Sequence, residues 1–428
     1  MMGSRCLRGP DPGFSDGLAS FMNALRLGKL ARFLVVIGLA TTPVMGRVAP
    51  AADEMSVPTQ LPPRPMETAE KRAERAAELR EVYSKPAAEW PAPEVDEGVD
   101  WVEIGLLPAL IEPADNPGTK AKVDLGKRLF FDPRVSGSGQ IACASCHDPD
   151  LGWADGRTIA FGHRREPLKR NSPGLMNIGY METFFWDGRA GSLEEQAREV
   201  ILNPLEMSAT PESVVKELSA VPEYREEFRE AFGSEQIDVD VVAKAIAAFE
   251  RSIVGGRSRF DHFMKGNAKT LSDEAVLGLD LFRGAARCMN CHNGPNFTDN
   301  QFHDLGLSYY NRELEDLGRY RITGDPDDVG RFRTPSLRNI GATGPYMHNG
   351  LFELTGVLNM YNAGMATLRR KPAETLDPLF PKKSPLLHPL GLNEQDLADL
   401  RAFLDSLTEP KLRVRAPALP GLASTDQP

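Results

Sequence analysis

Cysteine is scarce in this chain, with five residues in 428. Four of them form two closely spaced pairs, Cys143 with Cys146 and Cys288 with Cys291, and Cys6 stands alone near the start. Because no further pair remains, the sequence excludes a fold that depends on disulfides.

A long apolar run is also missing near the start of the chain. The apolar stretch at 33–45 is too short to cross a bilayer. Basic residues at 26, 29 and 32 precede it, and small residues at 49–51 follow it, so residues 1–52 are predicted to be an export signal with Met22 as an alternative start. An uncleaved membrane anchor is the alternative. No Arg-Arg pair precedes the run, so a twin-arginine route is not indicated.

The chain also lacks a net positive charge and has few sequence patterns typical of β-strands. The formal net charge is −10, which argues against nucleic acid as a partner and is compatible with a basic redox partner. Alternating β-branched residues are scarce, whereas helical apolar spacing recurs at 120–131, 239–253 and 272–282. Ser192 and Asn393 are expected to cap two more helices. The sequence therefore predicts a mainly α-helical protein with long loops.

Each cysteine pair is followed directly by a histidine, which gives two CxxCH motifs that end in His147 and His292. This motif attaches a c-type haem: the two thiols add to the vinyl groups, and the histidine becomes the proximal iron ligand. A structural zinc site takes its four ligands from two neighbouring pairs, but these pairs start at 143 and 288. A thioredoxin-like site would need only one pair. The motifs predict two covalently bound haems, electron transfer and, because such haems are attached outside the inner membrane, a periplasmic location.

The composition divides the chain into segments. Residues 53–100 are rich in Pro, Ala and Glu and are predicted to be a linker or tail, with an exposed helix near 67–84. The globular part is expected to comprise an N-terminal haem domain at 101–262 and a C-terminal haem domain at 263–412, followed by a tail at 413–428.

An internal repeat supports this division. After the first motif the chain reads Asn171-Ser-Pro-Gly-Leu-Met-Asn-Ile, and after the second it reads Arg333-Thr-Pro-Ser-Leu-Arg-Asn-Ile. Thirteen positions after each proline come Trp186-Asp-Gly and His348-Asn-Gly (173 to 186, 335 to 348). The repeat predicts two related cytochrome c-like haem domains, with Trp186 and His348 at equivalent positions.

Several strings resemble those of the bacterial di-haem cytochrome c peroxidases and their MauG-like relatives over about residues 105–408. They are Phe-Phe-Asp-Pro at 130–133, Phe-Phe-Trp-Asp-Gly-Arg-Ala at 184–190, Asn-Pro-Leu-Glu-Met at 203–207, Thr-Pro-Ser-Leu-Arg-Asn at 334–339 and Gly-Pro-Tyr-Met-His-Asn-Gly at 344–350. The resemblance implies reduction of hydrogen peroxide at the N-terminal haem. Electrons would come through the C-terminal haem from a small c-type cytochrome or copper protein. Relatives often form homodimers.

The resemblance also implies roles for single residues. Glu206 matches the distal acid/base of the peroxide site, and Gln196 would orient peroxide by hydrogen bonding. Trp186 matches a tryptophan that relays electrons between the haems. His163 matches a sixth ligand that closes the first iron in the resting enzyme. Each of these residues also has an ordinary structural interpretation. Glu206 would then be a surface glutamate, Trp186 a buried core residue, and His163 part of a solvated basic loop.

The resemblance also implies a calcium site and a sixth ligand for the iron of the second haem. Asn171, Thr343 and Pro345 match positions that hold a calcium ion between the domains, through amide and carbonyl oxygens. The sixth ligand of the second haem falls on Asn362 by direct counting from His348. The repeat indicates a one-residue deletion, which moves this place to Tyr361, with the nearby methionines as alternatives. These alternatives are Met360 and Met365.

Three functions compete at this point. A methionine ligand raises the haem potential and suits a peroxidase fed by a small donor. A tyrosinate lowers the potential and suits a MauG-like enzyme that uses peroxide to oxidise side chains of a partner protein. A non-catalytic di-haem electron carrier would need two coordinatively saturated irons, and the Glu206 motif weighs against it.

Overall fold

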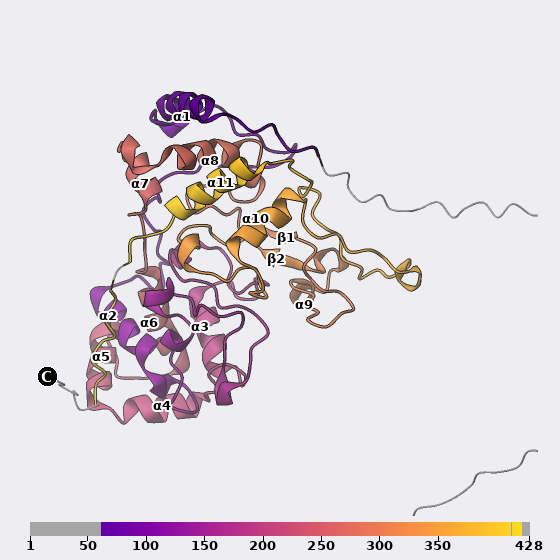
Figure 1. Ribbon diagram of the computed structural model, residues 1–428. Coiled ribbons are helices and arrows are strands. Elements are labelled where there is room, and N and C mark those ends of the chain that lie inside the picture. Colours follow the sequence, from indigo (N-terminus) through magenta and orange to yellow (C-terminus); the bar gives the residue numbers. More distant parts are fainter. Residues whose placement is uncertain (1–60, 412, 422–428) are drawn as a thin grey trace, which may run out of the picture. The chain divides into compact units, whose positions relative to one another are not determined.

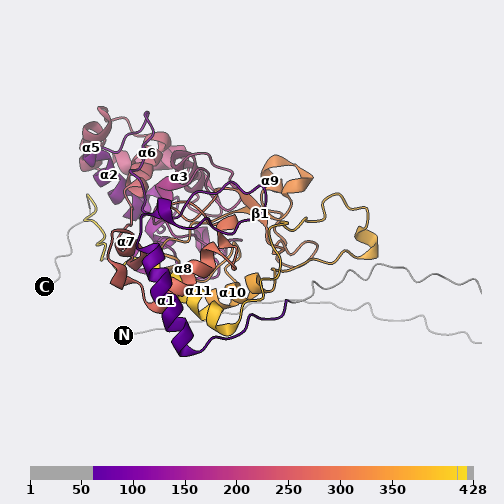
Figure 2. The same ribbon diagram turned by 90° about the horizontal axis from the view of Figure 1, so that it is seen from above.

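The computed structural model describes residues 61–411 and 413–421, and this part of the chain is mainly helical, as predicted. The helices fall into two groups (Figures 1 and 2). The first group comprises α2 (Lys120–Phe131), α3 (Leu193–Leu202), α4 (Pro211–Ser219), α5 (Pro222–Phe232) and α6 (Val239–Arg251). The second comprises α1 (Ala69–Tyr83), α7 (Arg259–Met264), α8 (Asp273–Arg283), α9 (Tyr320–Thr323), α10 (Leu354–Asn362) and α11 (Glu394–Ser406).

Some expectations concern other parts of the chain. The export signal at 1–52, the alternative start at Met22 and the lone Cys6 all lie outside the described residues. So does the end of the tail, at 422–428. Within the described ranges, no helix combines the length and the apolar character needed to cross a membrane.

Each group of helices packs around one crossing pair, α2 with α6 and α8 with α11. The helices begin where the sequence places capping side chains: Ser192 accepts a hydrogen bond from the Glu195 N–H, and Asn393 accepts one from the Asp396 N–H. The two buried cores hold aromatic clusters, and their fully buried members include Phe130 and Phe228 in the first core and Phe260, Phe282 and Phe403 in the second.

A glycine allows the helices to approach closely at both crossings. A Cβ atom on Gly126 would overlap the Ala245 carbonyl oxygen of α6, and one on Gly278 would overlap the Asp399 carbonyl oxygen of α11. These are backbone atoms, so a flexible side chain cannot move aside to make room. The glycine in α2 and the glycine in α8 therefore fix the same kind of contact in the two groups.

Gly278→Ala is expected to lower the free energy of unfolding by about 1–3 kcal/mol, because the added methyl group overpacks the crossing of α8 with α11. Gly356 in α10 offers a matched control, since nothing lies within 4 Å of a Cβ built there. Gly356→Ala should be neutral or stabilising by up to about 1 kcal/mol through helix propensity. Urea unfolding compares the two variants. Equal stability of both would contradict the packing argument.

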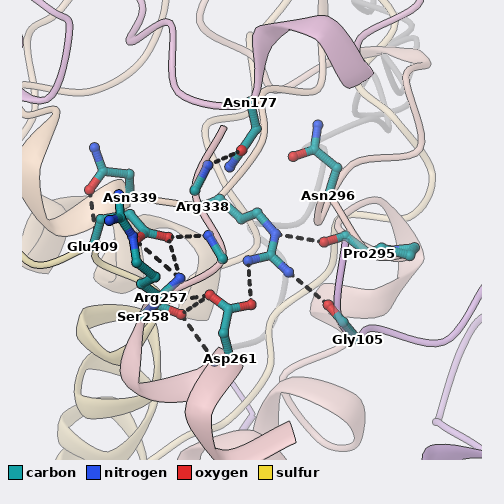
Figure 3. Close-up of polar contacts among 12 residues, drawn as sticks. Gly105, Asn177, Arg257, Ser258, Asp261, Pro295, Asn296, Arg338, Asn339 and Glu409 are labelled. Atoms are coloured by element: carbon teal, nitrogen blue, oxygen red, sulfur yellow. Dashed lines mark hydrogen bonds and ion pairs between the residues drawn. The ribbon is translucent and has the colours of Figure 1, made fainter. Parts of the chain in front are cut away.

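The two repeated strings adopt the same backbone conformation at matched positions. Asn177 and Asn339 both have left-handed φ angles, 63° and 64°, and each is followed by a short 3-10 turn. The Asn177 Oδ1 accepts a hydrogen bond from the Gly255 N–H at 2.8 Å, and the Asn339 Oδ1 accepts one from the Glu409 N–H at 3.2 Å (Figure 3). Asparagine is among the few residues that tolerate this conformation.

The prediction that 53–100 is a linker or tail is not met by the structure, because the part from residue 61 packs along the second group. We call residues 61–105 the N-terminal strap. Its helix α1 lies beside α8 (Figures 1 and 2). Arg72 makes a bidentate ion pair with the buried Asp399, at 2.7 and 3.0 Å, and Tyr83 and Trp90 are buried. Composition missed this because few residues are apolar and the charges pair with distant parts of the chain.

A buried ion pair fastens the strap to the second group (Figure 3). The Arg338 guanidinium donates to the Asp261 carboxylate of α7 at 2.9 Å, to the Gly105 carbonyl oxygen at 2.7 Å and to the Pro295 carbonyl oxygen at 2.7 Å. The exposed fractions of the Arg338 and Asp261 side chains are 1% and 0%. One guanidinium therefore joins α7, the strap and the segment that follows His292.

Two short strands complete the second group. β1 (Phe302–Asp304) pairs antiparallel with β2 (Arg331–Arg333), and Phe302 lies opposite Arg333. This pairing brings Phe332 and Arg333 back towards the second CxxCH motif, because β1 begins shortly after His292.

Candidate functional site

The first CxxCH motif folds as a short turn that presents its histidine. Cys143–Ser145 forms a 3-10 turn, and the His147 Nδ1 lies 3.0 Å from the Trp153 carbonyl oxygen. A carbonyl at this distance selects the tautomer with a proton on Nδ1, so Nε2 keeps the lone pair that binds iron. Burial lowers the pKa of His147, while the backbone oxygens of Trp153 and Pro173 act in the opposite direction. A neutral imidazole is the form that ligates a metal.

The second motif has the same geometry. Cys288–Asn290 forms a 3-10 turn, and the His292 Nδ1 lies 3.1 Å from the Phe297 carbonyl oxygen. Burial lowers the pKa of His292, and the opposing backbone oxygens belong to Phe297 and Pro335. The two prolines that act on the histidines, Pro173 and Pro335, are the matched prolines of the repeated strings.

The four thiols do not resemble those of a zinc site or a reactive redox pair. Burial raises the pKa of all four: Cys143, Cys146, Cys288 and Cys291. Zinc ligands and redox nucleophiles are thiolates, which these surroundings disfavour. Among the residues that the structure describes, the four thiols do not gather into one cluster; Cys291 alone of them lies in a group of possible metal ligands, with Asp299 and His303. Protonated thiols beside a histidine with a free Nε2 fit covalently held haem.

A cavity of about 240 Å³ adjoins the second motif. Cys288, Cys291 and His292 line it, and so does Tyr361 of α10. Most of the remaining wall is apolar, with Leu and Phe side chains from α8, α10 and α11, which suits a flat apolar macrocycle. Burial raises the pKa of the Tyr361 hydroxyl, and the thiols of Cys291 and Cys288 add to this effect. The hydroxyl therefore keeps its proton until a cation displaces it.

The three alternatives for the sixth ligand differ in position. Tyr361 is among the residues that line the cavity, whereas Met360 and Met365 are not. Met365 is buried and has a left-handed φ of 62°, and its N–H donates to the Met360 carbonyl oxygen at the end of α10. Asn362, the place found by direct counting, instead uses its side chain to bond both the N–H and the carbonyl oxygen of Leu392.

Glu206 lies in the loop that follows α3 and is half-buried. The Asn203 Nδ2 donates to its Oε1 at 3.1 Å. Burial raises the pKa of Glu206 to about 7; Arg189 and Asn203 lower it, and Glu199 raises it further. Burial raises the pKa of Cys146, and the negative charge of Glu206 adds to this effect, so that charge acts at the first CxxCH motif. A carboxyl group with a pKa near neutrality can both accept and return a proton.

His163 lies beside the same loop. Its N–H donates to the Leu205 carbonyl oxygen at 3.0 Å, and a Cβ atom on Gly162 would overlap that oxygen. The His163 Nδ1 is buried and has no hydrogen-bond partner among the described residues. The backbone of His163 thus packs against Leu205, the residue before Glu206.

Gln196 lies on α3, the helix that precedes the Glu206 loop, and is half-buried. Among the described residues, no hydrogen bond joins the Gln196 side chain to Glu206. Arg189 is the neighbour that the sequence did not single out. It lies within the string at 184–190, but only the fold shows that it pairs with Asp187 and Glu199 and lowers the pKa of Glu206.

Trp186 lies where the two groups of helices meet. Its Nε1 donates to the Asn171 carbonyl oxygen at 3.0 Å, and its ring approaches the His348 ring edge-on, with 6.5 Å between the centroids. Trp186 also lines the cavity of the second motif. The Arg333 N–H donates to the Trp186 carbonyl oxygen at 2.9 Å, and the Asn171 N–H donates to the His348 carbonyl oxygen at 2.8 Å. Each repeated string therefore bonds to the turn of the other copy.

An ion-pair network adds to this junction. Arg170 makes a bidentate pair with Asp316, at 2.7 and 2.9 Å, and also pairs with Asp187 at 2.6 Å. No sequence pattern marks these residues as partners, because 146 positions separate Arg170 from Asp316.

The three residues expected to bind calcium, Asn171, Thr343 and Pro345, all line the cavity that adjoins the second motif. Asn171 is buried, and its Nδ2 donates to the Arg157 carbonyl oxygen at 2.8 Å, which directs the amide oxygen elsewhere. A Cβ atom on Gly174 would come within 2.8 Å of the Thr343 side chain, so the strings at 171 and 343 are in close contact. With Pro345, these residues offer one amide and several carbonyl oxygens, the ligands that calcium prefers.

Comparison with known proteins agrees with this site. The di-haem cytochrome c peroxidase family profile matches residues 120–269. The methylamine utilization protein MauG of Methylorubrum extorquens is 42% identical over 310 residues, which cover 72% of this chain and 84% of that protein. Cytochrome-c peroxidase IdrP1 of Denitromonas iodatirespirans is 38% identical over 350 residues, covering 74% of this chain and 90% of that protein.

A solved structure shows the same fold. The crystal structure of a MauG-like protein associated with microbial copper homeostasis superposes with a TM-score of 0.64 at 34% identity, covering 71% of this chain and 95% of that chain. The chain belongs to the di-haem cytochrome c peroxidase family, as its motifs predicted. It is accordingly an oxidoreductase of the peroxidase type that works with two haems.

Proposed function

We propose that this enzyme reduces hydrogen peroxide to water in the periplasm, with electrons that a small c-type cytochrome or copper protein delivers to the C-terminal half. The observation that supports this proposal best is Glu206, a half-buried carboxyl group whose pKa burial raises to about 7 and whose charge acts on Cys146 of the first CxxCH motif. A carboxyl group beside a haem attachment motif serves peroxide cleavage directly, whereas an electron carrier has no use for it.

The two CxxCH motifs supply the attachment points in this proposal. Cys143 and Cys146 would hold the first haem, Cys288 and Cys291 the second, and His147 and His292 would ligate the irons from one side. Bound at the first motif, haem iron would supply the open coordination position and the redox chemistry that cleaves the O–O bond.

The protein's own groups handle the protons. The Glu206 carboxylate accepts a proton from one peroxide oxygen and returns it to the other, so that oxygen leaves as water. Gln196 would orient the peroxide from α3. Two further protons and two electrons complete the conversion of one peroxide to two waters.

Three further assignments belong to the same proposal. Trp186 would relay electrons between the halves, supported by its place at their junction and in the cavity wall. His163 would close the first iron in the resting enzyme, supported by its unpartnered Nδ1 beside the Glu206 loop. Asn171, Thr343 and Pro345 would hold calcium between the halves.

We also infer that the two halves derive from one repeated haem unit. The matched φ angles of Asn177 and Asn339 and the matched glycines of the helix crossings support this inference. The order of the halves then assigns peroxide chemistry to the first, because the loop that carries Glu206 belongs to it.

A second function is favoured by Tyr361. Of the three alternatives for the sixth ligand, only this residue is among those that line the cavity. A phenolate ligand would lower the potential of the second haem, which suits peroxide-driven oxidation of side chains in a partner protein. MauG of Methylorubrum extorquens, a methylamine utilization protein, is among the relatives of this chain.

Tyr361→Phe tests this assignment. If Tyr361 is the ligand, the variant should lose the tyrosinate-to-iron absorption and change the spin state of the second haem, while the first haem stays unchanged. Met360→Leu, its neighbour on α10, should leave both spectra as in the wild type. Unchanged ligation in Tyr361→Phe would contradict the MauG-like function.

Peroxide titration separates the two functions. One equivalent of peroxide is added to the fully oxidised protein, and the haem absorption is followed. A lasting change at once is expected for the MauG-like function, because the first iron is then open without prior reduction. A change only after one haem is reduced is expected if His163 gates a conventional peroxidase. Failure of every reduced small cytochrome or copper protein to support turnover would contradict the peroxidase function.

A further inference from the structure

Arg333 is a buried cation without a buried anion. Its exposed fraction is 6%, and its Nη1 has no hydrogen-bond partner among the described residues. The Nε donates only to the Phe185 carbonyl oxygen, at 3.3 Å. Burial alone lowers the pKa of Arg333, to about 10, and no carboxylate contributes to the shift. A buried charge of this kind is strongly unfavourable unless an anion joins it.

The other buried arginines in the described part of the chain do have their anions. Arg338 pairs with Asp261 at 2.9 Å, Arg283 with Glu103 at 2.5 Å and Arg251 with Glu194 at 2.8 Å. Arg333 is therefore an exception among its neighbours. Its matched position in the first repeated string is Asn171, which is neutral, so the charge is specific to the second half.

A second orphaned polar atom lies in the same wall. The His348 Nε2 is buried and has no partner within the described part of the chain. The His348 ring stacks on Phe332, the residue before Arg333, with 3.7 Å between the centroids and 11° between the planes. Burial lowers the pKa of His348 to about 4, so the ring is neutral and can donate through Nε2. Arg333 and His348 both line the cavity of the second motif.

We propose that Arg333 and His348 form a carboxylate-binding pair that anchors a propionate side chain of the second haem. This inference rests on the proposed function only in taking the second CxxCH motif as the haem site. A propionate offers two acceptor oxygens and one negative charge, which match a guanidinium and an imidazole N–H. The pair also explains why a buried cation is tolerated beside Trp186, since its anion arrives with the cofactor.

The charge of Arg333 has a consequence for electron transfer. A cation near the haem favours the reduced state, which carries one more electron. Removal of the cation should therefore lower the midpoint potential of the second haem and leave that of the first nearly unchanged. This places Arg333 among the positioning residues of the second haem and gives its role a readout that does not depend on peroxide turnover.

Spectroelectrochemical titration of the holoenzyme without peroxide tests the proposal. In Arg333→Gln, the ratio of reduced to oxidised second haem at a fixed potential should fall about tenfold, a shift of about 59 mV for one electron. Arg333→Lys keeps the charge and should remain close to the wild type. Arg331→Gln removes a half-exposed cation from the same strand and serves as the matched control. Equal potentials in the wild type and Arg333→Gln would overturn the proposal.

Two further measurements address the possibilities that Arg333→Gln fails to fold and that the pair binds a different anion. If Arg333→Gln fails to retain haem, His348→Phe tests the same site without loss of charge, and an unchanged propionate band in its resonance Raman spectrum would overturn the proposal. A wild-type potential that shifts when acetate is added would assign the pair to a free anion and would also overturn it. None of these results depends on whether the enzyme reduces peroxide.

Discussion

Glu206→Gln should lower the rate of peroxide reduction about 100- to 10,000-fold, because glutamine cannot accept a proton from peroxide and return it. The side chains have nearly the same size, so the absorption spectra of both haems should stay as in the wild type. Steady-state turnover with a reduced small cytochrome measures the effect. Glu212→Gln, at an exposed site at the start of α4, is the control and should have full activity. A loss of less than tenfold in Glu206→Gln would remove this residue from the mechanism.

The pH dependence of the same reaction follows from the surroundings of Glu206. Burial raises the pKa of Glu206 to about 7, and the reaction begins with its ionised form. The rate should therefore fall as the pH is lowered through about 7. Glu199 adds to the raised pKa, so Glu199→Gln should move the midpoint of the profile to lower pH. A midpoint near the ordinary pKa of a glutamate, unaffected by Glu199→Gln, would contradict this account.

Arg338→Met should lower the free energy of unfolding by about 3–5 kcal/mol, because it leaves the Asp261 carboxylate buried without its cation. The same change releases the carbonyl oxygens of Gly105 and Pro295, so the strap and the segment after His292 should loosen as well. Urea unfolding of the holoprotein, followed by haem absorbance and circular dichroism, measures the effect.

The control for this prediction is an exposed pair. Arg401 and Asp405 in α11 form an ion pair at 2.9 Å, with 41% and 37% of their side chains exposed. Arg401→Met should cost only about 0–1 kcal/mol, because water screens the pair. If Arg338→Met were no less stable than Arg401→Met, the buried pair would not be a main fastening of the strap.

Local signals predicted the parts of the fold that depend on neighbours in sequence. Ser192 and Asn393 begin their helices because a capping side chain acts within three residues. The CxxCH motifs are equally local, and both fold as a short 3-10 turn ahead of the histidine; the role of each histidine as an iron ligand stays a prediction. The repeated strings predicted equivalent positions for Trp186 and His348. That equivalence stays a prediction, while the structure shows that the two rings approach each other edge to face.

Local sequence signals could not predict contacts between residues that are far apart in the chain. Arg72 and Asp399 are 327 positions apart, so the composition of the strap gave no sign of its packing. Arg338 and Asp261 are 77 positions apart. The solitary charge of Arg333 is a property of its surroundings, and a sequence cannot show that an arginine lacks a carboxylate. The sequence could thus name candidate haem-binding and catalytic residues, whose roles stay predictions, but it could not show the charges and hydrogen bonds that surround them.

The crossed bonds between the repeated strings have a consequence for the origin of the molecule. The Asn171 N–H bonds to the His348 carbonyl oxygen, and the Arg333 N–H bonds to the Trp186 carbonyl oxygen, so each half completes a turn of the other. Reciprocal contacts of this kind are the mark of an isologous interface between identical subunits. The junction within this one chain therefore has the reciprocal pattern of contacts that a two-fold symmetric interface has, with one backbone hydrogen bond in each direction.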